Sequence, residues 1–585
     1  MQFKSSQENL SKSSSDSSVE SRRGFMKGLI AGGVLGTIPL PQSSLGQSTP
    51  AHYTEPPVLT GKTFDLTIDK KPVNFTGVSR MATAINGSVP GPTLRWKEGD
   101  VITINVTNRL SEPTSLHWHG IILPYTMDGV PGLSYGGIQP GETFQYRFKV
   151  EQSGTYWYHS HSGFQEMTGM YGAIIIDPIE EDEIEADRDH VILLSEWTDE
   201  NPHHVFQKLK TMGHLYNFSQ PTMPALLDDI ASYGLQAALS KRSMFNAMRM
   251  KPTDLADLSG ETLSYLMNGV PPDANGTRVF SPGERVRLRI VNGAGNTFFD
   301  FRIPGLAMTI VQVDGVNVHP VTVDEFRIGP GETYDAVVKP TERAYTLFAE
   351  TMERSGYALG TLAVDRGLAS TIPARREVEW LSMTDMMGDM SSSEHDMEGM
   401  TASGHGGSNQ PPVRAIHATT EFGPSTDMRV DTPRTNLDDP GVGLRNASHR
   451  VLVLSDLKAL HGEYDRREVD REIELHLTGN MERYSWSIDG LEYGKSTPVH
   501  FKHGEKIRVH LHNDTMMTHP MHLHGMWSDL EDGEGNFLTR RHTIPVQPAQ
   551  RISFTVTADA LGRWAWHCHL LLHMDAGMFR EVVVA

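Results

Sequence analysis

Three segments of the chain share one pattern of apolar and polar positions. Each has an x-Gly turn, then a Gly followed by Asp or Glu, then alternating positions that end at Asn: INGSVPGPTLRWKEGDVITINVTN, MNGVPPDANGTRVFSPGERVRLRIVN and IDGLEYGKSTPVHFKHGEKIRVHLHN. In the first segment, Ile102, Ile104 and Val106 fall on one side of the alternation. A period of two predicts a strand with one buried face.

The spacing that follows these segments also repeats. Nine residues beyond the terminal Asn lie His117, Phe301 and His522. Nineteen residues beyond Pro140, Pro330 and Pro548 lie His159, Ala349 and His567. Equal offsets in three places indicate tandem duplication of one β-sandwich unit, so we expect an all-β protein. The middle unit has Phe301 and Ala349 in place of histidines, which indicates that it keeps the fold without the ligands.

The repeats and the stretches between them predict four parts in the mature chain. These are a first domain at 50–178, a second at 188–368, a Met-rich linker at 369–448 and a third domain at 449–585. Within the second domain, an Ala- and Leu-rich run from about Leu226 to Met250 predicts an added helix.

The linker contains the segment LSMTDMMGDMSSSEHDMEGMTASGHGG, which begins at Leu381. It is polar, rich in Gly and Ser and without periodicity, which predicts a flexible loop. Its soft or imidazole side chains are Met383, Met386, Met387, Met390, Met397, Met400, His395 and His405. One interpretation is a partly buried Met-rich flap. The other is thioether ligation of Cu(I), assisted by the histidines.

Eight histidines fall in four clusters near the ends of the chain. They are His117 and His119, His159 and His161, His522 and His524 (with His519 just before), and His567 and His569. Residues two apart on a strand point the same way, so each His-x-His pair presents two imidazoles to one side. Two pairs belong to the first domain and two to the third. A common metal site therefore requires an interface between these domains.

Cys568 is the only cysteine of the chain and lies between His567 and His569. Most single cysteines are small buried hydrophobes. Here, however, His573 and Met578 follow, and thiolate, imidazole and thioether form the ligand set of a blue-copper site. Cys568 should point away from its two neighbours, and we infer that His519 is the fourth ligand. The peptide around Cys568 would then connect two metal sites covalently.

Composition restricts the partners and the N-terminus indicates the compartment. The 585 residues include 52 basic and 72 acidic ones, a formal net charge of −20, which argues against nucleic acid or an anionic membrane as partner. In SRRGFMKGLIAGGVLGTIPLP, Arg22 and Arg23 precede an apolar run too short to span a bilayer. This pattern is typical of a twin-arginine signal, so we expect export to the periplasm with residues 1–46 removed, and no membrane insertion.

The motifs HWHG, HSH, HPMHLHG and HCHLLLHMDAGM resemble the multicopper oxidases over the whole mature chain. HWHGIILPYTMDGVPG, GTYWYHSHSGFQ and the Met-rich segment are similar to the copper-resistance protein A branch of that family. The resemblance implies three tandem cupredoxin-like Greek-key β-sandwiches. It also implies four copper ions: one type 1, one type 2 and two type 3.

The resemblance further implies a role for each ligand. Type 1 copper would take His519, Cys568, His573 and Met578, and type 2 copper would take His117 and His522. One type 3 ion would take His119, His159 and His569, and the other His161, His524 and His567. Asp128 falls where many members have an acid that helps to protonate oxygen intermediates, although an exposed carboxylate in a Pro/Gly turn is an equal alternative. Met574 stands where some cuprous oxidases have Glu, which leaves a second proton route open.

Three functions are consistent with these features. The first is a periplasmic oxidase that couples one-electron oxidation of Cu(I) to reduction of O2 to water, in copper resistance. The second is a copper-sequestering protein, and the third is a laccase-like oxidase of phenols. The expected partners are O2, Cu(I) or a small organic reductant, and other periplasmic copper-handling proteins.

Overall fold

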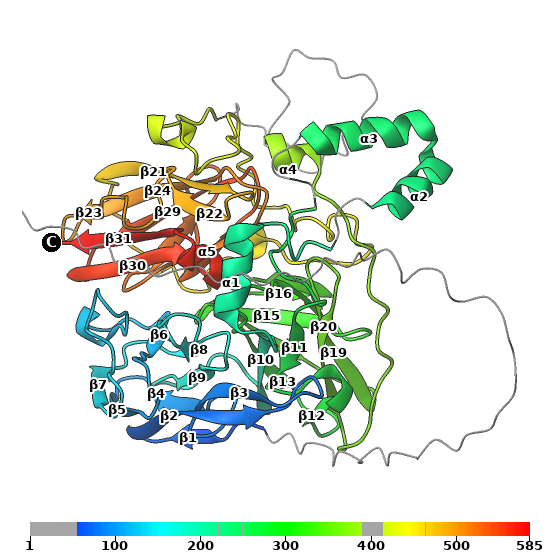
Figure 1. Ribbon diagram of the computed structural model, residues 1–585. Coiled ribbons are helices and arrows are strands. Elements are labelled where there is room, and N and C mark those ends of the chain that lie inside the picture. Colours follow the sequence, from blue (N-terminus) through cyan, green and yellow to red (C-terminus); the bar gives the residue numbers. More distant parts are fainter. Residues whose placement is uncertain (1–54, 219–221, 248–250, 252, 389–412, 463) are drawn as a thin grey trace, which may run out of the picture. The chain divides into compact units, whose positions relative to one another are not determined.

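The computed structural model describes residues 55–585, except 219–221, 248–250, 252, 389–412 and 463 (Figure 1). The predicted signal segment, 1–46, lies outside the described residues. So do Met390, His395, Met397, Met400 and His405 of the Met-rich segment.

The first β-sandwich has two sheets around one core. One sheet has the order β3 (Arg80–Ile85), β2 (Thr63–Val73), β5 (Val101–Asn108), β7 (Thr143–Lys149). The other has the order β1 (Val58–Thr60), β4 (Thr93–Lys97), β9 (Tyr171–Asp177), β8 (Gly154–His159), β6 (His117–His119). As predicted, Ile102, Ile104 and Val106 are buried in the core between these sheets.

The second and third sandwiches are built in the same way. In the second sandwich, one sheet has the order β11 (Ser264–Met267), β10 (Arg188–Trp197), β13 (Val286–Asn292), β18 (Thr333–Val338), β15 (Met308–Val313), β16 (Val316–Val323). The other sheet has the order β12 (Gly276–Val279), β20 (Tyr357–Ala363), β19 (Ala344–Thr351), β14 (Phe299–Arg302), β17 (Glu325–Ile328). In the third sandwich, one sheet has the order β22 (Ser485–Ile488), β21 (Arg471–Asn480), β24 (Lys506–Asn513), β29 (Arg551–Thr557), β26 (Ser528–Glu531), β27 (Phe537–Arg541). The other sheet has the order β23 (Val499–Phe501), β31 (Phe579–Val584), β30 (Gly562–Cys568), β25 (His519–Leu523), β28 (Thr543–Val546). The all-β, three-sandwich prediction is confirmed.

The repeated offsets correspond to equivalent places in the three sandwiches. In each, the strand of the repeat segment (β5, β13, β24) pairs in parallel with one neighbour and antiparallel with the other. The residues at the two offsets are direct partners on adjacent antiparallel strands: His117 with His159, Phe301 with Ala349, and His522 with His567.

Each repeat segment ends in an Asn whose buried side chain makes three hydrogen bonds, and these bonds explain why Asn recurs at this position. The amide of Asn108 donates to the carbonyls of Glu112 and Ile138, and its oxygen accepts from the Leu110 N–H. Asn292 and Asn513 make the same three contacts in their own sandwiches. A buried amide with both donors and its acceptor used fixes the turn that leads to the ligand strand.

The helices of the described residues are additions to this β framework. They are α1 (Pro202–Thr211), α2 (Met223–Tyr233), α3 (Leu235–Ala247), α4 (Met383–Met387) and α5 (Leu571–Asp575), with 3-10 turns η1 (Tyr125–Met127), η2 (Pro272–Ala274), η3 (Thr419–Phe422) and η4 (Leu454–Asp456). The predicted single helix at about 226–250 is a pair, α2 and α3, because Gly234 at φ +84° ends the first.

The Met-rich segment is not entirely a loop. Ser382 caps α4 with a capping box, and Met386 is 4% exposed in the core. Met383 packs against the same core, whereas Met387 is exposed. The prediction of a flexible loop was wrong at this end, because a Ser-x-x-Asp capping box stabilises one helical turn in spite of the polar composition.

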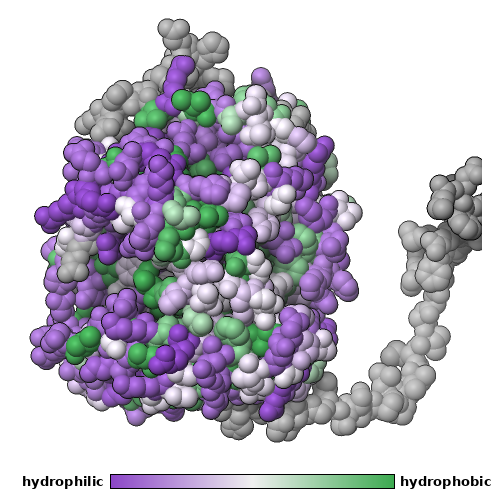
Figure 2. All heavy atoms as spheres, turned by 90° about the vertical axis from the view of Figure 1, so that its left-hand side faces the viewer, coloured by the Kyte–Doolittle hydropathy of each residue, from purple (hydrophilic) through white to green (hydrophobic). Residues whose placement is uncertain are grey.

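The outer surface is mainly hydrophilic on the side drawn in Figure 2, where apolar residues appear in small scattered groups. None of the helices within the described residues is long and apolar enough to cross a membrane.

Candidate metal centre

The four His-x-His clusters converge between the first and third sandwiches, which are drawn in blue to cyan and in orange to red (Figure 1). His117 and His119 flank Trp118 on β6, and the Trp118 ring is buried in the core of the first sandwich. The alternation of the strand therefore sends both imidazoles out of that core, toward His522 and His524 of the third sandwich. The His117 and His524 rings stack at 4.0 Å, and the His119 and His522 rings stack at 3.8 Å.

The imidazoles fall into groups whose ring nitrogens lie within 4.8 Å of one another. These groups are His119, His159, His569; His161, His524, His567; and His117, His522, His524. In the second group, His567 Nε2 lies 3.0 Å from His524 Nε2 and 3.4 Å from His161 Nε2. Nitrogens bonded to one metal at roughly 2 Å would have about this separation. The His117 and His522 ring centres are 5.8 Å apart.

Several of these nitrogens have no hydrogen-bond partner among the described residues. They are Nε2 of His117, His159 and His522, and both nitrogens of His119 and His569. Leaving a buried polar atom unpaired costs about 1–3 kcal/mol. These atoms belong to five imidazoles that meet at one interface, and a metal ion bound to one nitrogen of each ring would satisfy five of them.

Burial also sets the charge state of the cluster. It lowers the pKa of His119, His159, His161, His522, His524 and His569 well below the ordinary value, and that of His567 to about 3. Neighbouring imidazoles add to the effect for most of them. These seven imidazoles are therefore neutral at pH 7, and the neutral ring has the free lone pair that a metal needs.

Two buried carboxyl groups border the cluster. Asp128 is 2% exposed, and its Oδ2 lies 2.9 Å from His524 Nδ1 while its Oδ1 lies 3.3 Å from His117 Nδ1. The alternative of an exposed turn carboxylate is thus excluded. Glu166 Oε2 lies 2.7 Å from His159 Nδ1, and burial raises the Glu166 pKa well above its usual value. Both groups orient imidazoles by contacting the nitrogen that faces away from the cluster.

Cys568 turns to the other side of β30, as predicted. Its Sγ lies 3.4 Å from His519 Nδ1 and 3.9 Å from His573 Nδ1, and these two nitrogens are 3.2 Å apart. Met578 is fully buried, its carbonyl accepts from the Cys568 N–H, and its own N–H donates to the His573 carbonyl. The structure therefore brings the sulfur and two imidazoles of the predicted type 1 set together, with Met578 beside them.

The far nitrogens of this second site also have partners. Thr515 Oγ1 lies 2.7 Å from His519 Nε2, and Asp257 Oδ2 lies 2.8 Å from His573 Nε2. Tyr484 donates its hydroxyl to the same Asp257 oxygen at 2.7 Å. Burial raises the pKa of the Cys568 thiol, so without metal the sulfur keeps its proton. A bound cation would replace that proton.

The middle sandwich reaches the histidine cluster although it supplies none of its histidines. Gly331 has φ +88°, and a Cβ there would lie 2.9 Å from His569 Cδ2 and 3.2 Å from His119 Nε2. Its neighbour Glu332, together with Asp314, pairs with the fully buried Arg541 of the third sandwich. Only a glycine allows the backbone this close approach.

Sequence reasoning missed four side chains of these sites: Asp257, Glu166, Thr515 and His542. His542 is a ninth imidazole, with its ring centre 4.9 Å from that of His119 and its carbonyl 2.6 Å from His522 Nδ1. Its signal was a histidine just before a strand, but outside any His-x-His pair. Asp257 comes from another sandwich, so no local pattern could reveal it.

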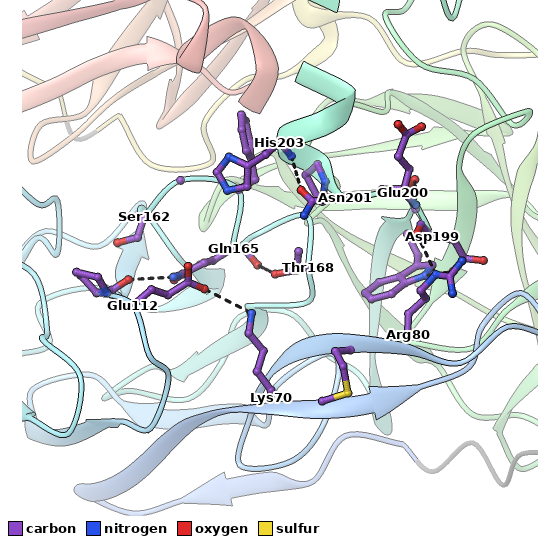
Figure 3. A pocket seen from close by; sticks show the side chains of 17 residues that line it. Lys70, Arg80, Glu112, Ser162, Gln165, Thr168, Asp199, Glu200, Asn201 and His203 are labelled. Carbon is purple, nitrogen blue, oxygen red and sulfur yellow. Dashed lines mark hydrogen bonds and ion pairs between the residues drawn. The ribbon is translucent and has the colours of Figure 1, made fainter. Parts of the chain in front are cut away.

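A polar pocket of about 530 Å³ lies at the surface beside the loop that follows His161 (Figure 3). Lys70, Arg80, Glu112 and Asp199 line it, together with Ser162 and Gln165 of that loop. None of the clustered histidines lines it. The loop has a structural role, because Gln165 accepts hydrogen bonds from Thr114 and Ser160 behind the cluster.

Comparison with known proteins gives consistent matches. Three protein-family models, each described as multicopper oxidase, match residues 67–181, 188–367 and 466–585. The chain is 50% identical to copper resistance protein A of Escherichia coli, over 96% of this chain and 99% of that protein. It is 49% identical to copper resistance protein A of Pseudomonas syringae pv. tomato, with the same coverage.

Solved structures agree on the fold. Fet3p, described as a multicopper oxidase that functions in iron import, superposes with a TM-score of 0.60 at 19% identity and covers 90% of each chain. A laccase from Botrytis aclada gives a TM-score of 0.59 at 20% identity, covering 91% of this chain and 88% of the other. The matched segments and the 50% identity together place the chain in the multicopper oxidase family, whose members are copper-dependent oxidoreductases.

Proposed function

We propose that this oxidase takes electrons from Cu(I) in the periplasm and uses them to reduce O2, as part of copper resistance. Four Cu(I), one O2 and four protons then give four Cu(II) and two water molecules. The observation that supports this best is the position of Cys568. Its sulfur faces His519 and His573, while the adjacent His567 and His569 face the eight-histidine cluster.

The proposed ligands follow the groups of nitrogens described above. His519, Cys568, His573 and Met578 would hold type 1 copper, and His117 with His522 would hold type 2. The two type 3 ions would bind to His119, His159, His569 and to His161, His524, His567. Copper in these sites would accept electrons singly from the reductant and deliver four of them to O2.

The chain's own residues would position this chemistry and supply protons. The peptide between Cys568 and its neighbours gives a covalent path for electrons from one site to the other. Asp128 would hold His117 and His524 in place and pass protons toward the cluster from its carboxyl oxygens. At Met574, where a second acid is absent, the side chain packs against the core and moves no proton.

Cu(I) as substrate is supported by the relatives and by the methionines. The two similar proteins reported above are named for copper resistance. Thioethers favour Cu(I) over harder ions, and Met387 presents one at the surface. We further propose that Met390, Met397 and Met400 capture Cu(I) for the type 1 site.

The test compares oxygen consumption by copper-loaded protein with Cu(I) and with a phenol. A matched variant replaces Met390, Met397 and Met400 by Leu, which keeps the bulk and removes the sulfur. Met383 and Met386 stay untouched because they pack in the core. We expect Cu(I) oxidation to fall severalfold in the variant, with phenol oxidation unchanged.

Each other result counts against part of the proposal. Oxygen consumption with the phenol alone would identify a laccase-like enzyme. Stoichiometric copper binding without oxygen consumption would indicate sequestration. Equal loss of both activities in the Leu variant would show that these methionines are structural.

A further inference from the structure

A second group of imidazoles and carboxylates lies in the third sandwich, outside both sites described above. His476 is on β21, Asp514 directly follows β24, and His417 and Glu421 come from the segment that includes η3. All four side chains are nearly or fully buried, with side-chain exposures of 3%, 0%, 9% and 1%. No feature of the oxidase reaction uses them.

Four donor atoms of this group converge. His476 Nδ1 lies 2.7 Å from Asp514 Oδ2 and 3.3 Å from Glu421 Oε2. His417 Nδ1 lies 2.8 Å from the same Glu421 oxygen and 3.8 Å from the same Asp514 oxygen. Ligands at about 2.0–2.2 Å around a tetrahedral ion are roughly 3.3–3.6 Å apart. The observed separations bracket this range.

The backbone holds each carboxylate in its orientation. Glu421 Oε1 accepts from the Ala418 N–H at 3.0 Å, and Asp514 Oδ1 accepts from the Val430 N–H at 2.7 Å. The remaining oxygen of each group is thereby directed at the two imidazoles. Supporting hydrogen bonds of this kind are what orients ligands in metal sites.

The charge at this place already favours a cation. Two carboxylates, of Glu421 and Asp514, face the imidazoles of His417 and His476 at short range. The group lies close to the surface, because His417 Nε2 is 3.4 Å from Asp431, an acid with a 90% exposed side chain.

We propose that His417, Glu421, His476 and Asp514 form a binding site for a divalent transition-metal ion. Two imidazoles and two carboxylates suit Zn(II) and Cu(II), and among divalent ions such sites generally bind Cu(II) most tightly. Cu(II) bound here is additional to the four ions of the oxidase. The site does not depend on the identity of the oxidase substrate.

The site is nevertheless connected to the type 1 region. Asp514 is followed by Thr515, whose hydroxyl contacts His519. Asp514, a proposed ligand of this site, is therefore adjacent in sequence to Thr515, which contacts the proposed type 1 ligand His519. Filling the site should alter the type 1 absorbance slightly without removing it.

The experiment uses the copper-loaded enzyme and Zn(II) as probe, because Zn(II) is redox-inactive and binds thioether poorly. Equilibrium dialysis measures Zn(II) taken up per chain, and anomalous diffraction at the zinc edge locates it. Cu(II) is then added in a parallel dialysis. We expect one more Zn(II) or Cu(II) per chain in the wild type than in the variants His417→Gln and Glu421→Gln.

The two variants and a control separate binding from folding. His417→Gln changes a side chain at the edge of the group, and Glu421→Gln keeps the shape of the carboxylate. The affinity should fall at least about tenfold in each, the effect that loss of even an outer-shell partner produces. His461→Gln disrupts a surface imidazole–carboxylate pair with Glu183 and should retain full binding.

The proposal is overturned if the wild type takes up no more Zn(II) and Cu(II) than His417→Gln. It is equally overturned if the anomalous peak lies elsewhere, in which case the group is only a buried ion-pair network. Because the readout is metal content, a failure of Cu(I) oxidation in the assay proposed above would leave this result unaffected.

Discussion

Asp257 offers a direct test of how the middle sandwich acts on the proposed type 1 site. Its carboxylate lies 2.8 Å from His573 Nε2 and is held by the Tyr484 hydroxyl, and Asp257 is 5% exposed. The change Asp257→Asn removes the negative charge while keeping the size of the side chain. Oxidised copper carries one more positive charge than reduced copper, so the wild-type carboxylate stabilises the oxidised form. Its loss should raise the reduction potential.

The magnitude follows from the geometry. A metal bound to His573 Nδ1 at about 2 Å would lie roughly 7 Å from the Asp257 carboxylate across the imidazole ring. With an effective dielectric constant of about 20, one unit charge at that distance contributes about 2 kcal/mol. For a one-electron couple, about 1.4 kcal/mol corresponds to about 59 mV. We therefore expect an increase of roughly 100 mV in Asp257→Asn.

The assay is a redox titration of the blue absorbance of the copper-loaded protein. Glu261→Gln is the matched control, since Glu261 is an exposed acid four residues further along the same segment. The control should leave the potential within about 20 mV of the wild type, because solvent screens exposed charges. An Asp257→Asn shift no larger than that of the control, or a decrease, would refute the reasoning.

Three further predictions test other parts of the sites. Cys568→Ser should abolish the intense visible band with the fold intact by circular dichroism, because Ser lacks the soft sulfur; a persisting band would contradict the type 1 assignment. Gly331→Ala should lower the copper content by displacing His119 and His569. Gly367→Ala should not, because Gly367 has a similar positive φ but open space around it. Equal copper contents in the two variants would refute the close approach at Gly331. Copper-free protein should lose stability as pH falls from about 6.5 toward about 4, measured as its thermal unfolding midpoint. The folded-state pKa values of about 4 for His542 and about 3 for His567 lie below the unfolded value of about 6.5, so in this pH range these residues gain protons only in the unfolded chain. Each residue then lowers the free energy of unfolding by about 1.4 kcal/mol per pH unit. A constant or rising midpoint would exclude this reasoning.

The architecture and the histidine convergence could be predicted from sequence because both follow from local periodicity. A period of two fixes which face of a strand each His takes, and the repeated offsets place His117 beside His159 and His522 beside His567. The opposite orientation of Cys568 follows from the same alternation. Such patterns require no knowledge of which domains touch.

The remaining site residues depend on contacts that local patterns do not encode. Asp257 approaches His573 from a different sandwich, and Glu166 contacts His159 from within an irregular loop. The short helix α4 could not be predicted from the sequence for a different reason. Its polar composition indicates a loop, while the cap at Ser382 and the buried Met386 stabilise a helical turn through tertiary packing.

The middle sandwich supplies none of the clustered histidines but contacts several of them. It contributes the glycine backbone that abuts His119 and His569, the acid that contacts His573, and two carboxylates for Arg541. Arg541 has no exposed surface, and removing one partner of a buried ion pair costs about 3–5 kcal/mol. The residue after Arg541 is His542, whose carbonyl holds His522. Loss of the middle sandwich would therefore disturb Arg541, the adjacent His542 and, through the His542 carbonyl, His522. We expect this sandwich to fix the geometry of the histidines that the other two sandwiches supply.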